Sequence, residues 1–481
     1  MSEPRRVAEF EWELPVGFVD GMNVPGRVFA SKDLFDKALA DRAAEQVANV
    51  ATLPGIVGAS YAMPDIHWGY GFPIGGVAAT DPDAGGVLSP GGVGFDIGCG
   101  VRLMRTDLQR DDLLDSLKEV VDALGRHVPR GVGGSGRLKL KGGDLDRVLT
   151  EGVAYAVERN AGWDEDLESC EDSGTLPDAD TSQVSERAKE RGTSQLGSLG
   201  AGNHFLEVQV VDEIRDARAA EVLGLSSGQV CVMIHSGSRG IGHQTCTDYL
   251  RSIDRLGNTF GYEPPDRQLA CAPLSHDLAE SYRRAMNACG NFALANRQVL
   301  MDGARKAFES VFSRSARDLG MRLVYDVAHN LAKLEAHTVD GAKRRVCVHR
   351  KGATRAFGPS HSDLPERFRQ TGQPVLIPGS MGTASFILTG TDESGERSFS
   401  STCHGAGRAM SRTKAKKQMS GQDLRRRLEG EGIVLAKTRW KSLSEEAPYA
   451  YKDAEEVVET CEGAGLSRVV ARLRPMGVVK G

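Results

Sequence analysis

Five segments of this chain, four of them apolar and one that reads Ser-Ser-Thr-Cys, are each predicted as β-strands and run directly into short loops that carry histidine, serine, glycine or arginine. These segments do not alternate regularly with helical ones, which argues against a doubly wound parallel sheet. We therefore predict a layered α+β fold of mostly antiparallel sheets with surrounding helices, and one domain over residues 1–481. The segments are 230–234, 323–325, 346–348, 375–377 and 400–403, and the loops after them begin at His235, Asp326, His349, Pro378 and His404.

A further loop combines many glycines with two potential metal ligands. Residues 94–102 read Gly-Phe-Asp-Ile-Gly-Cys-Gly-Val-Arg, and they follow other glycines at 85–86 and 91–92. Glycine allows backbone conformations that other residues avoid, so the loop can direct both Asp96 and Cys99 toward one point. A carboxylate and a thiolate together can bind a transition metal. The stretch alone is also compatible with a glycine turn before a strand, with Cys99 an ordinary buried residue.

Composition limits the classes of protein to which the chain can belong. Glycine accounts for 57 of the 481 residues, above the usual fraction of about 7%. The 60 basic and 65 acidic residues give a net charge of −5, so a nucleic acid would have to bind to a local basic patch. The chain shows no signal-peptide pattern, no apolar stretch of membrane-spanning length and no disulfide framework among its nine cysteines. We therefore expect a cytoplasmic protein without a membrane partner.

Residue periodicity predicts the elements around these segments. The acidic segment 161–180 predicts a surface excursion, and the glycine- and lysine-rich segment 130–143 predicts a loop that can meet phosphate or simply be solvated. Residues 62–76 predict an irregular loop, in which Trp68 and Phe72 fit a binding site or the core equally well. Helices are expected over 33–53, 111–124, 143–159 and 276–313, and soon after Ile241.

Three histidines near predicted strands extend the possible metal site. Each of His204, His235 and His329, taken alone, is more often structural than metal-binding. Together with Asp96 and Cys99, they favour a metal centre. Nitrogen, oxygen and sulfur donors suit zinc, iron or manganese better than magnesium. A bridging Cys99 thiolate would allow two ions, which can clamp the attacking and leaving oxygens of a phosphoryl transfer.

Cationic residues in the same loops predict a phosphate-binding groove on an otherwise acidic chain. His404 lies in a Gly/Ala turn four residues before Arg408. Its imidazole could act as a nucleophile that forms a covalent intermediate, or as a fourth metal ligand, and the residues alone fit both roles. The residues expected to form the groove are Arg239, His349, Arg350, Lys351, Arg408 and Arg412.

Seven motifs, in one order along the chain, resemble those of the RtcB family. The similarity runs from about residue 15 to Lys480, and the segment 160–195 is similar to that of the longer archaeal-type members. The resemblance implies the RtcB fold in one catalytic domain. The motifs are GFDIGCGVR (94–102), LGSLGAGNHFLEVQ (196–209), HSGSRGIG (235–242), DVAHN (326–330), HRKGATRA (349–356), PGSMGTAS (378–385) and HGAGRAMSR (404–412).

The resemblance implies a GTP-dependent RNA ligase that acts in tRNA splicing or RNA repair. Such an enzyme joins a 2′,3′-cyclic-phosphate or 3′-phosphate end of RNA to a 5′-hydroxyl end. His404 would attack the α-phosphate of GTP and become guanylylated. The guanylate would then pass to the RNA 3′-phosphate, and the 5′-hydroxyl would displace it. RNA with these ends is the expected partner, and an archease-type activator is a further candidate.

The same resemblance implies the ligands of two Mn²⁺ ions and of the nucleotide. Cys99 would bridge the ions, with His235 and His329 on one ion and Asp96 and His204 on the other. The residues that match the family's guanylate pocket are Asn203, Phe205, Glu207, Asn330, Ser380, Met381, Ser385, Gly405, Ala406, Gly407, Tyr451 and Lys480.

Two other functions compete with ligation. A two-metal phosphatase or nuclease could use the same metal ligands with water as the nucleophile, but it would need neither His404 nor a guanine pocket. A non-catalytic RNA-binding protein should expose basic and aromatic surface, whereas aromatic residues make up only 6% of this chain. The unusual residues are metal donors and glycines, which favours the ligase.

Overall fold

The protein contains two large β-sheets, which the computed structural model describes over residues 2–131, 133–437 and 443–481. The first sheet has seven strands, all antiparallel to their neighbours except for the parallel pair β3–β4. Its order is β1 (Arg5–Ala8), β2 (Glu11–Leu14), β3 (Gly26–Phe29), β4 (Ile56–His67), β5 (Ile74–Thr80), β13 (Ala342–Lys351) and β12 (Asn330–Val339).

The second sheet has eight strands and carries most of the predicted site. Strand β18 (Val434–Leu435) lies off the main path and pairs in parallel with β19, while the other pairs are antiparallel. Two short pairs, β10 (Ala272–Pro273) with β6 (Val87–Leu88) and β14 (Ala353–Arg355) with β17 (Ser401–Cys403), complete the described strands. The order along the path is β11 (Arg322–Ala328), β7 (Gly100–Gln109), β9 (Gln229–Ser236), β8 (Phe205–Ile214), β19 (Ser467–Lys480), β16 (Ser385–Gly390) and β15 (Pro374–Ile377).

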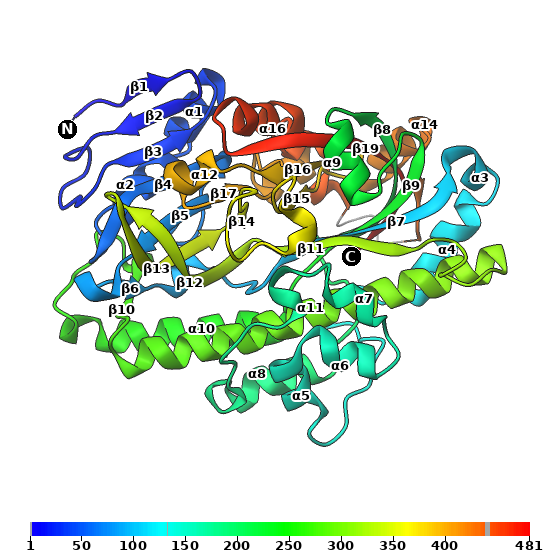
Figure 1. Ribbon diagram of the computed structural model, residues 1–481, viewed down its shortest axis with the longest axis horizontal. Helices are drawn as coiled ribbons and strands as arrows, with labels where there is room; N and C mark the ends of the chain where they lie inside the picture. Colours follow the sequence, from blue (N-terminus) through cyan, green and yellow to red (C-terminus); the bar gives the residue numbers. More distant parts are fainter. Residues whose placement is uncertain (1, 132, 438–442) are drawn as a thin grey trace.

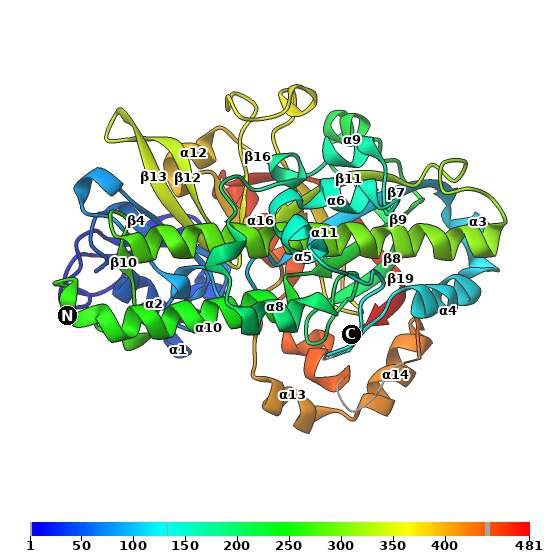
Figure 2. The ribbon, with the colours of Figure 1, turned by 90° about the horizontal axis from the view of Figure 1, so that it is seen from below.

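Helices surround these sheets, which confirms the predicted layered α+β fold. The two long helices α10 and α11 run along the molecule below the sheets, with the segment from α5 to α8 outside them (Figures 1 and 2). Within the described residues, no helix is both long and apolar enough to cross a bilayer. The helices are α1 (Lys32–Ala40), α2 (Ala43–Val50), α3 (Arg110–Leu114), α4 (Leu117–His127), α5 (Asp144–Glu151), α6 (Val153–Glu158), α7 (Asp164–Leu167), α8 (Glu186–Thr193), α9 (Ala217–Leu223), α10 (Arg239–Leu256), α11 (Asp277–Phe312), α12 (Glu393–Ser398), α13 (Arg412–Gln418), α14 (Gly421–Gly430) and α16 (Ala454–Gly463).

Apolar side chains fill the space between these layers. The largest cluster joins the inner face of the eight-stranded sheet to α4, α5, α6, α10 and α11. A second cluster joins the seven-stranded sheet to α1, α2, α16 and strands β15 and β16, so it connects the two sheets. A third covers the other face of the eight-stranded sheet under α9. The sheet that carries the site is therefore held on both faces.

Strand register brings the predicted ligands to one edge of the eight-stranded sheet. Neighbouring strands run in opposite directions, so the start of one strand lies beside the end of the next. Gly100, which follows Cys99, pairs with both Ala328 and Ser236. His235 pairs with Phe205, and Phe205 pairs in turn with Lys480. Segments far apart in the chain therefore meet along one row.

Two of the predicted helices illustrate how well periodicity predicts local structure. The helix expected over 276–313 is confirmed as α11, which ends where Ser313 adopts a left-handed conformation with φ of 51°. The helix expected over 33–53 is wrong in its continuity. It is broken at Asp41 and Arg42, where Arg42 has φ of 65°, and two separate helices result. Continuous apolar spacing did not reveal this break.

Two segments expected as loops are strands. Residues 62–67 continue β4, and the chain returns at Ile74 as β5, so most of the segment 62–76 belongs to the first sheet. The basic segment that begins at His349 finishes β13 and continues as β14. Its cations therefore alternate across sheet faces, as strand geometry requires, and do not share one loop surface.

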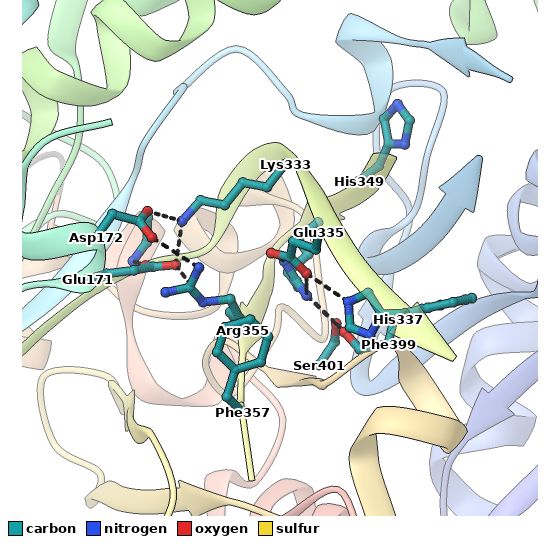
Figure 3. A network of polar contacts seen from close by, with 12 residues as sticks. Glu171, Asp172, Lys333, Glu335, His337, His349, Arg355, Phe357, Phe399 and Ser401 are labelled. Atoms are coloured by element: carbon teal, nitrogen blue, oxygen red, sulfur yellow. Dashed lines mark hydrogen bonds and ion pairs between the residues drawn. The ribbon is translucent and has the colours of Figure 1, made fainter. Parts of the chain in front are cut away.

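The acidic segment 161–180 is not simply a surface excursion. Both Asp166 oxygens accept hydrogen bonds from buried Arg305, at 2.7 and 2.8 Å. Glu171 accepts from Lys333 at 2.7 Å and lies 3.3 Å from the Arg355 guanidinium, with Asp172 in the same network (Figure 3). Cations on other elements, one buried and two half-buried, draw these carboxylates inward, because a buried charge requires a partner. Charge composition alone does not show such partners.

Candidate active site

The predicted metal ligands meet in one buried cluster. The Sγ atom of Cys99 lies 3.4 Å from Nε2 of His204 and 3.3 Å from Nε2 of His235. Nε2 of His329 is 3.4 Å from Nε2 of His235, and Oδ2 of Asp96 is 2.9 Å from Nε2 of His204. Three of these groups, the thiol and the His204 and His235 rings, offer ligand atoms that all lie within 4.8 Å of one another. A metal ion fits this set of donor atoms.

Glycines allow the loops of the cluster to approach one another. Gly98 has φ of 68°, in the left-handed region that glycine tolerates best. At Gly237, an added Cβ would lie 2.2 Å from Oδ1 of Asp96, so only glycine leaves room for this carboxylate. The backbone N–H of Ser238 donates to the same oxygen at 3.1 Å. These contacts fix Asp96 beside His204.

Burial controls the protonation of the clustered side chains. It lowers the pKa values of His235 and His329 well below the ordinary value, and the neighbouring imidazoles add to this effect. Burial, with Asp96 nearby, raises the pKa of the Cys99 thiol. Burial also opposes ionisation of Asp96, but His204 and Arg239 outweigh it, so the pKa of this carboxyl is lowered. Neutral imidazoles are the form that binds a metal, and a bound cation would displace the thiol proton.

His404 lies beside this cluster and is oriented by Asp65. The His404 and His329 ring centroids are 4.8 Å apart. Nδ1 of His404 donates to Oδ2 of Asp65 at 2.5 Å, and the His404 backbone N–H donates to the same oxygen at 3.0 Å. Because the carboxylate accepts, the imidazole proton is on Nδ1 and the lone pair is on Nε2. The unprotonated Nε2 is the atom that can act as a nucleophile.

Asp65 is itself held in place from both sides. The Lys452 ammonium donates to the carbonyls of Pro64, at 3.2 Å, and of Ile66, while its backbone N–H donates to the Gly407 carbonyl at 2.9 Å. Gly407 has φ of 73°, and a Cβ there would lie 2.2 Å from the Asp65 carbonyl oxygen. The turn that follows His404 therefore packs directly against the segment that carries Asp65.

A cavity of about 350 Å³ opens beside the cluster and His404. Its lining brings together most of the residues that the sequence predicted for metal, nucleotide and phosphate. The predicted residues in the lining are Asp96, Cys99, Asn203, Phe205, His235, His329, Asn330, Ser380, His404, Gly405, Ala406, Gly407, Arg408, Arg412, Tyr451 and Lys480. Those outside it are His204, Glu207, Arg239, His349, Arg350, Lys351, Met381 and Ser385.

The buried Glu207 has unsatisfied hydrogen-bonding capacity. Gln209 donates to Oε2 of Glu207 at 2.8 Å and to Oγ of Ser385 at 2.9 Å. No described residue donates to Oε1 of Glu207, although the atom is buried. Burial raises the pKa of Glu207 to about 7 and lowers that of Lys480 to about 8. An orphaned acceptor of this kind fits a ligand that brings N–H donors.

Two predicted phosphate-binding arginines line the cavity but share a carboxylate. Arg408 donates to Oε2 of Glu446 at 3.0 Å, and Arg412 donates to Oε1 at 3.0 Å. The Tyr451 hydroxyl also donates to Glu446. Arg239 lies outside the lining and donates to Oγ of Ser198 at 3.3 Å. The cationic side of the cavity is therefore formed mainly by Arg408, Arg412 and Lys480.

The structure gives Arg350 and Lys351 other partners. Arg350 is buried and donates to both oxygens of Glu335, at 2.7 and 2.8 Å, and to Oγ of Ser401 at 2.8 Å. Glu335 and Ser401 lie together in the polar network of Figure 3. The Lys351 ammonium donates to the carbonyls of Tyr70 and Phe72, and burial lowers its pKa to about 7. Neither cation is directed to the cavity.

Sequence reasoning missed three residues of the site. Asp65 and Glu446 lie outside the seven motifs. Their partners, His404 and Arg408, lie within the motif 404–412. His67 also lines the cavity. For Trp68 the alternatives are now resolved, because it lines the cavity and is 45% exposed, whereas Phe72 is fully buried. The mixture of acid, histidine and tryptophan in 62–76 was the only signal in the sequence.

An α+β scaffold whose strand ends gather thiol, imidazole and carboxylate groups beside a polar cavity is typical of a metalloenzyme. The family model described as "tRNA-splicing ligase RtcB" matches residues 46–481. The tRNA-splicing ligase RtcB of Archaeoglobus fulgidus is 51% identical over 477 residues, which cover 99% of this chain and 98% of the relative. That of Methanococcus maripaludis is 51% identical over the full length of both chains. The RNA-splicing ligase RtcB of Mycobacterium tuberculosis is 53% identical over 91% of this chain and 100% of its own.

The extent of these matches identifies the chain as an enzyme of the ligase class. It belongs to the RtcB family, as its seven motifs indicated.

Proposed function

We propose that this enzyme joins RNA 3′-phosphate or 2′,3′-cyclic-phosphate ends to 5′-hydroxyl ends, with GTP as the co-substrate and His404 as the guanylylated residue. The observation that carries the proposal is the bond from Nδ1 of His404 to Asp65, 2.5 Å long, beside a buried metal-type cluster. This bond leaves Nε2 free for attack. A phosphatase or nuclease that uses water as its nucleophile has no need of an imidazole oriented in this way.

In the proposed first step, Nε2 of His404 attacks the α-phosphate of GTP. A phosphorus–nitrogen bond forms, the bond to the β-phosphate oxygen breaks, and pyrophosphate leaves. The Nδ1 proton stays on the His404 ring throughout, and the Asp65 carboxylate that accepts it stabilises the positive charge that develops on the imidazole. Water opens an RNA 2′,3′-cyclic phosphate to a 3′-phosphate. An oxygen of that phosphate then takes the guanylate from His404, and the 5′-hydroxyl finally displaces GMP.

Manganese is the metal that we propose for the cluster. Asp96, Cys99, His204, His235 and His329 would hold it, and we propose two ions. Bound metal would supply Lewis-acid stabilisation of the phosphate charge. The chain's own contribution is to keep the imidazoles neutral and to direct the carboxylate and thiol into the cluster.

For the nucleotide we propose the cavity beside His404. Supporting observations are its volume of about 350 Å³, the Lys480 ammonium in its lining and the orphaned Glu207 acceptor nearby. Guanine offers N–H donors on the edge that would meet a carboxylate. The RNA phosphates would bind at Arg408 and Arg412, which must then exchange part of their contact with Glu446.

Ligation of a defined RNA tests this proposal. A fragment with a 2′,3′-cyclic phosphate is incubated with a labelled 5′-hydroxyl fragment, Mn²⁺ and either GTP or ATP. The expected product is joined RNA with GTP only, and none with His404→Ala. Shortened or dephosphorylated RNA without joining would instead support the phosphatase or nuclease.

A cytoplasmic location and one catalytic domain also remain proposals. The location is supported by the nine cysteines, all of which are buried and carry free thiols.

An archease-type activator is tested by adding such a protein to the ligation assay, where we expect joined RNA to form faster.

A further inference from the structure

The long helix α11 carries three consecutive polar residues that are completely buried. Asn296, Arg297 and Gln298 each have no exposed surface. The backbone groups of the helix already bond to one another, so these side chains need partners on other elements. Buried polar groups require hydrogen-bond partners, and a buried guanidinium requires charge compensation as well. The partners of Asn296 and Arg297 are the segments that carry the metal-type cluster.

Arg297 contacts three of these segments at once. Its Nη1 donates to the carbonyls of Gly98, at 2.8 Å, and Ser236, at 3.0 Å. Nη2 donates to Oδ1 of Asp326 at 2.7 Å, and Nε also contacts this carboxylate. Gly98 precedes Cys99, Ser236 follows His235, and Asp326 lies three residues before His329. One side chain therefore joins two backbone carbonyls and one carboxylate, each on a segment that carries a proposed ligand.

Asn296 joins the loop that leads to His204. Its Oδ1 accepts from the backbone N–H groups of Gly197, at 2.8 Å, and Ser198, at 3.1 Å. Its Nδ2 donates to the carbonyls of Ser198 and Gly237, both at 3.2 Å, and to Oγ of Ser236 at 3.1 Å. Gly237 is the residue whose missing side chain makes room for Asp96.

The helix also packs tightly under the cluster. A Cβ on Gly98 would lie 3.0 Å from both Cα of Gly290 and Cβ of Ala293, and one on Gly100 would lie 3.0 Å from Cζ of Arg297. The loop cannot shift toward the helix without a clash.

We propose that Arg297 and Asn296 are positioning residues of the metal centre, which set the spacing of its ligands by joining the four loops that carry them. This inference rests on the proposed metal-binding function of the cluster. Neither side chain contacts the ligand atoms themselves. They act as outer-shell groups, whose loss typically weakens metal affinity by about 10- to 100-fold.

The chain offers a matched control on the same helix. Arg305 is buried, forms a bidentate pair with Asp166 and donates to the Met321 carbonyl. Arg297 resembles it, since it also pairs with a carboxylate and donates to backbone carbonyls. Arg305 lies eight residues, or about 12 Å, farther along the helix and contacts none of the ligand-bearing loops. A lysine at either position keeps the charge but cannot span all the acceptors of the guanidinium.

The test is a Co²⁺ titration of metal-free protein, followed by the visible absorption of the cobalt centre and its thiolate charge-transfer band. We expect Arg297→Lys to weaken Co²⁺ binding by about 10-fold or more and to alter the absorption spectrum. Arg305→Lys should bind Co²⁺ as the wild type does, even if it melts at a lower temperature. Equal affinity and equal spectra for folded Arg297→Lys and wild type would overturn the proposal.

A second variant keeps the test decisive if Arg297→Lys does not fold. Asn296→Ser should also weaken Co²⁺ binding by about 10-fold, and unchanged binding by the folded variant would contradict the positioning role. Wild-type protein that binds no Co²⁺ would instead contradict the proposed metal centre, and the positioning role with it. A wild type that binds Co²⁺, together with a variant that binds it more weakly, supports both the metal centre and the positioning role.

Discussion

The imidazole of His404 and the carboxylate of Asp65 lie 2.5 Å apart, although 339 positions separate them in the chain. The same carboxylate oxygen also accepts the His404 backbone N–H at 3.0 Å. This double contact fixes both the orientation and the tautomer of the ring. It makes Asp65 the residue on which the nucleophilicity of His404 should most depend.

Asp65→Asn should slow guanylylation while leaving the fold intact. An amide of the same shape can stabilise the wrong tautomer and cannot offset the charge of the imidazolium, so we expect a loss of about 100-fold or more in rate. Single-turnover labelling with α-labelled GTP measures it. Asp81→Asn, which alters a buried carboxylate paired with Arg344, is the control and should label normally. Equal rates for Asp65→Asn and wild type would remove Asp65 from the mechanism.

Metal should stabilise the folded protein. A ligand that binds only the native state at 100 times its dissociation constant adds about 2.7 kcal/mol to the free energy of unfolding. We therefore expect Mn²⁺ to raise the melting temperature of chelator-treated protein, and Cys99→Ser to reduce that shift. An unchanged melting temperature across a Mn²⁺ titration would show that the cluster does not bind this ion.

Glu207 should make stability depend on pH. Its folded-state pKa of about 7 lies above the ordinary value of 4.5, so the folded protein favours the protonated acid. This contribution is complete below about pH 4.5 and is lost as the pH rises to about 7, a change of at most about 3 kcal/mol. Relative to wild type, Glu207→Gln should therefore gain stability between pH 5 and pH 8. Urea unfolding at the two pH values measures the difference, and a constant difference would contradict the assignment.

Trp68 should contribute to RNA binding but not to nucleotide transfer. Its indole is 45% exposed at the cavity, and a base stacked on an aromatic ring is worth about 1–3 kcal/mol. Trp68→Ala should weaken the binding of single-stranded RNA by about 10-fold, while Trp68→Phe retains most of it. Fluorescence anisotropy with labelled RNA measures both. Reduced guanylylation of Trp68→Ala would show that the residue acts on GTP instead.

Removing the charge of Arg350 and removing that of Arg408 should have different effects on the protein. Loss of the buried Arg350 leaves Glu335 without its bidentate partner, and we expect Arg350→Met to destabilise the protein by about 3–5 kcal/mol. Arg408→Met should mainly weaken RNA binding and reduce its dependence on salt. Denaturant unfolding and RNA titrations at two salt concentrations separate the two effects. Weaker RNA binding by a stable Arg350→Met variant would show that Arg350 contacts the RNA phosphates after all.

The sequence predicts those helices and strands whose own residues carry a regular apolar pattern. The apolar run at 230–234 and the long stripe of α11 specify their own elements, and both are found. The antiparallel, layered arrangement follows because strands do not alternate with helices. Whether the proposed residues perform the assigned chemistry remains a prediction.

What the sequence does not predict depends on partners that lie far away. Arg350 stands in a basic run, but it pairs with Glu335 on the adjacent strand β12, four positions from its register partner Leu331, and is buried there. Asp166 stands in an acidic run, but Arg305 draws it into the core. The sequence predicted a phosphate groove for Arg350 and a surface excursion for Asp166, and tertiary pairing overrides both. Asp65 is a similar case, since no local pattern connects it to His404.

Mapping the covalent adduct tests the central proposal most directly. Wild-type protein is incubated with GTP and Mn²⁺, digested under neutral conditions and examined by mass spectrometry for a peptide that carries one GMP. We predict an acid-labile adduct on His404, greatly reduced in Asp65→Asn. An adduct on a lysine such as Lys480 or Lys452, or no adduct in protein with bound Mn²⁺, would contradict the assignment of His404 as the nucleophile.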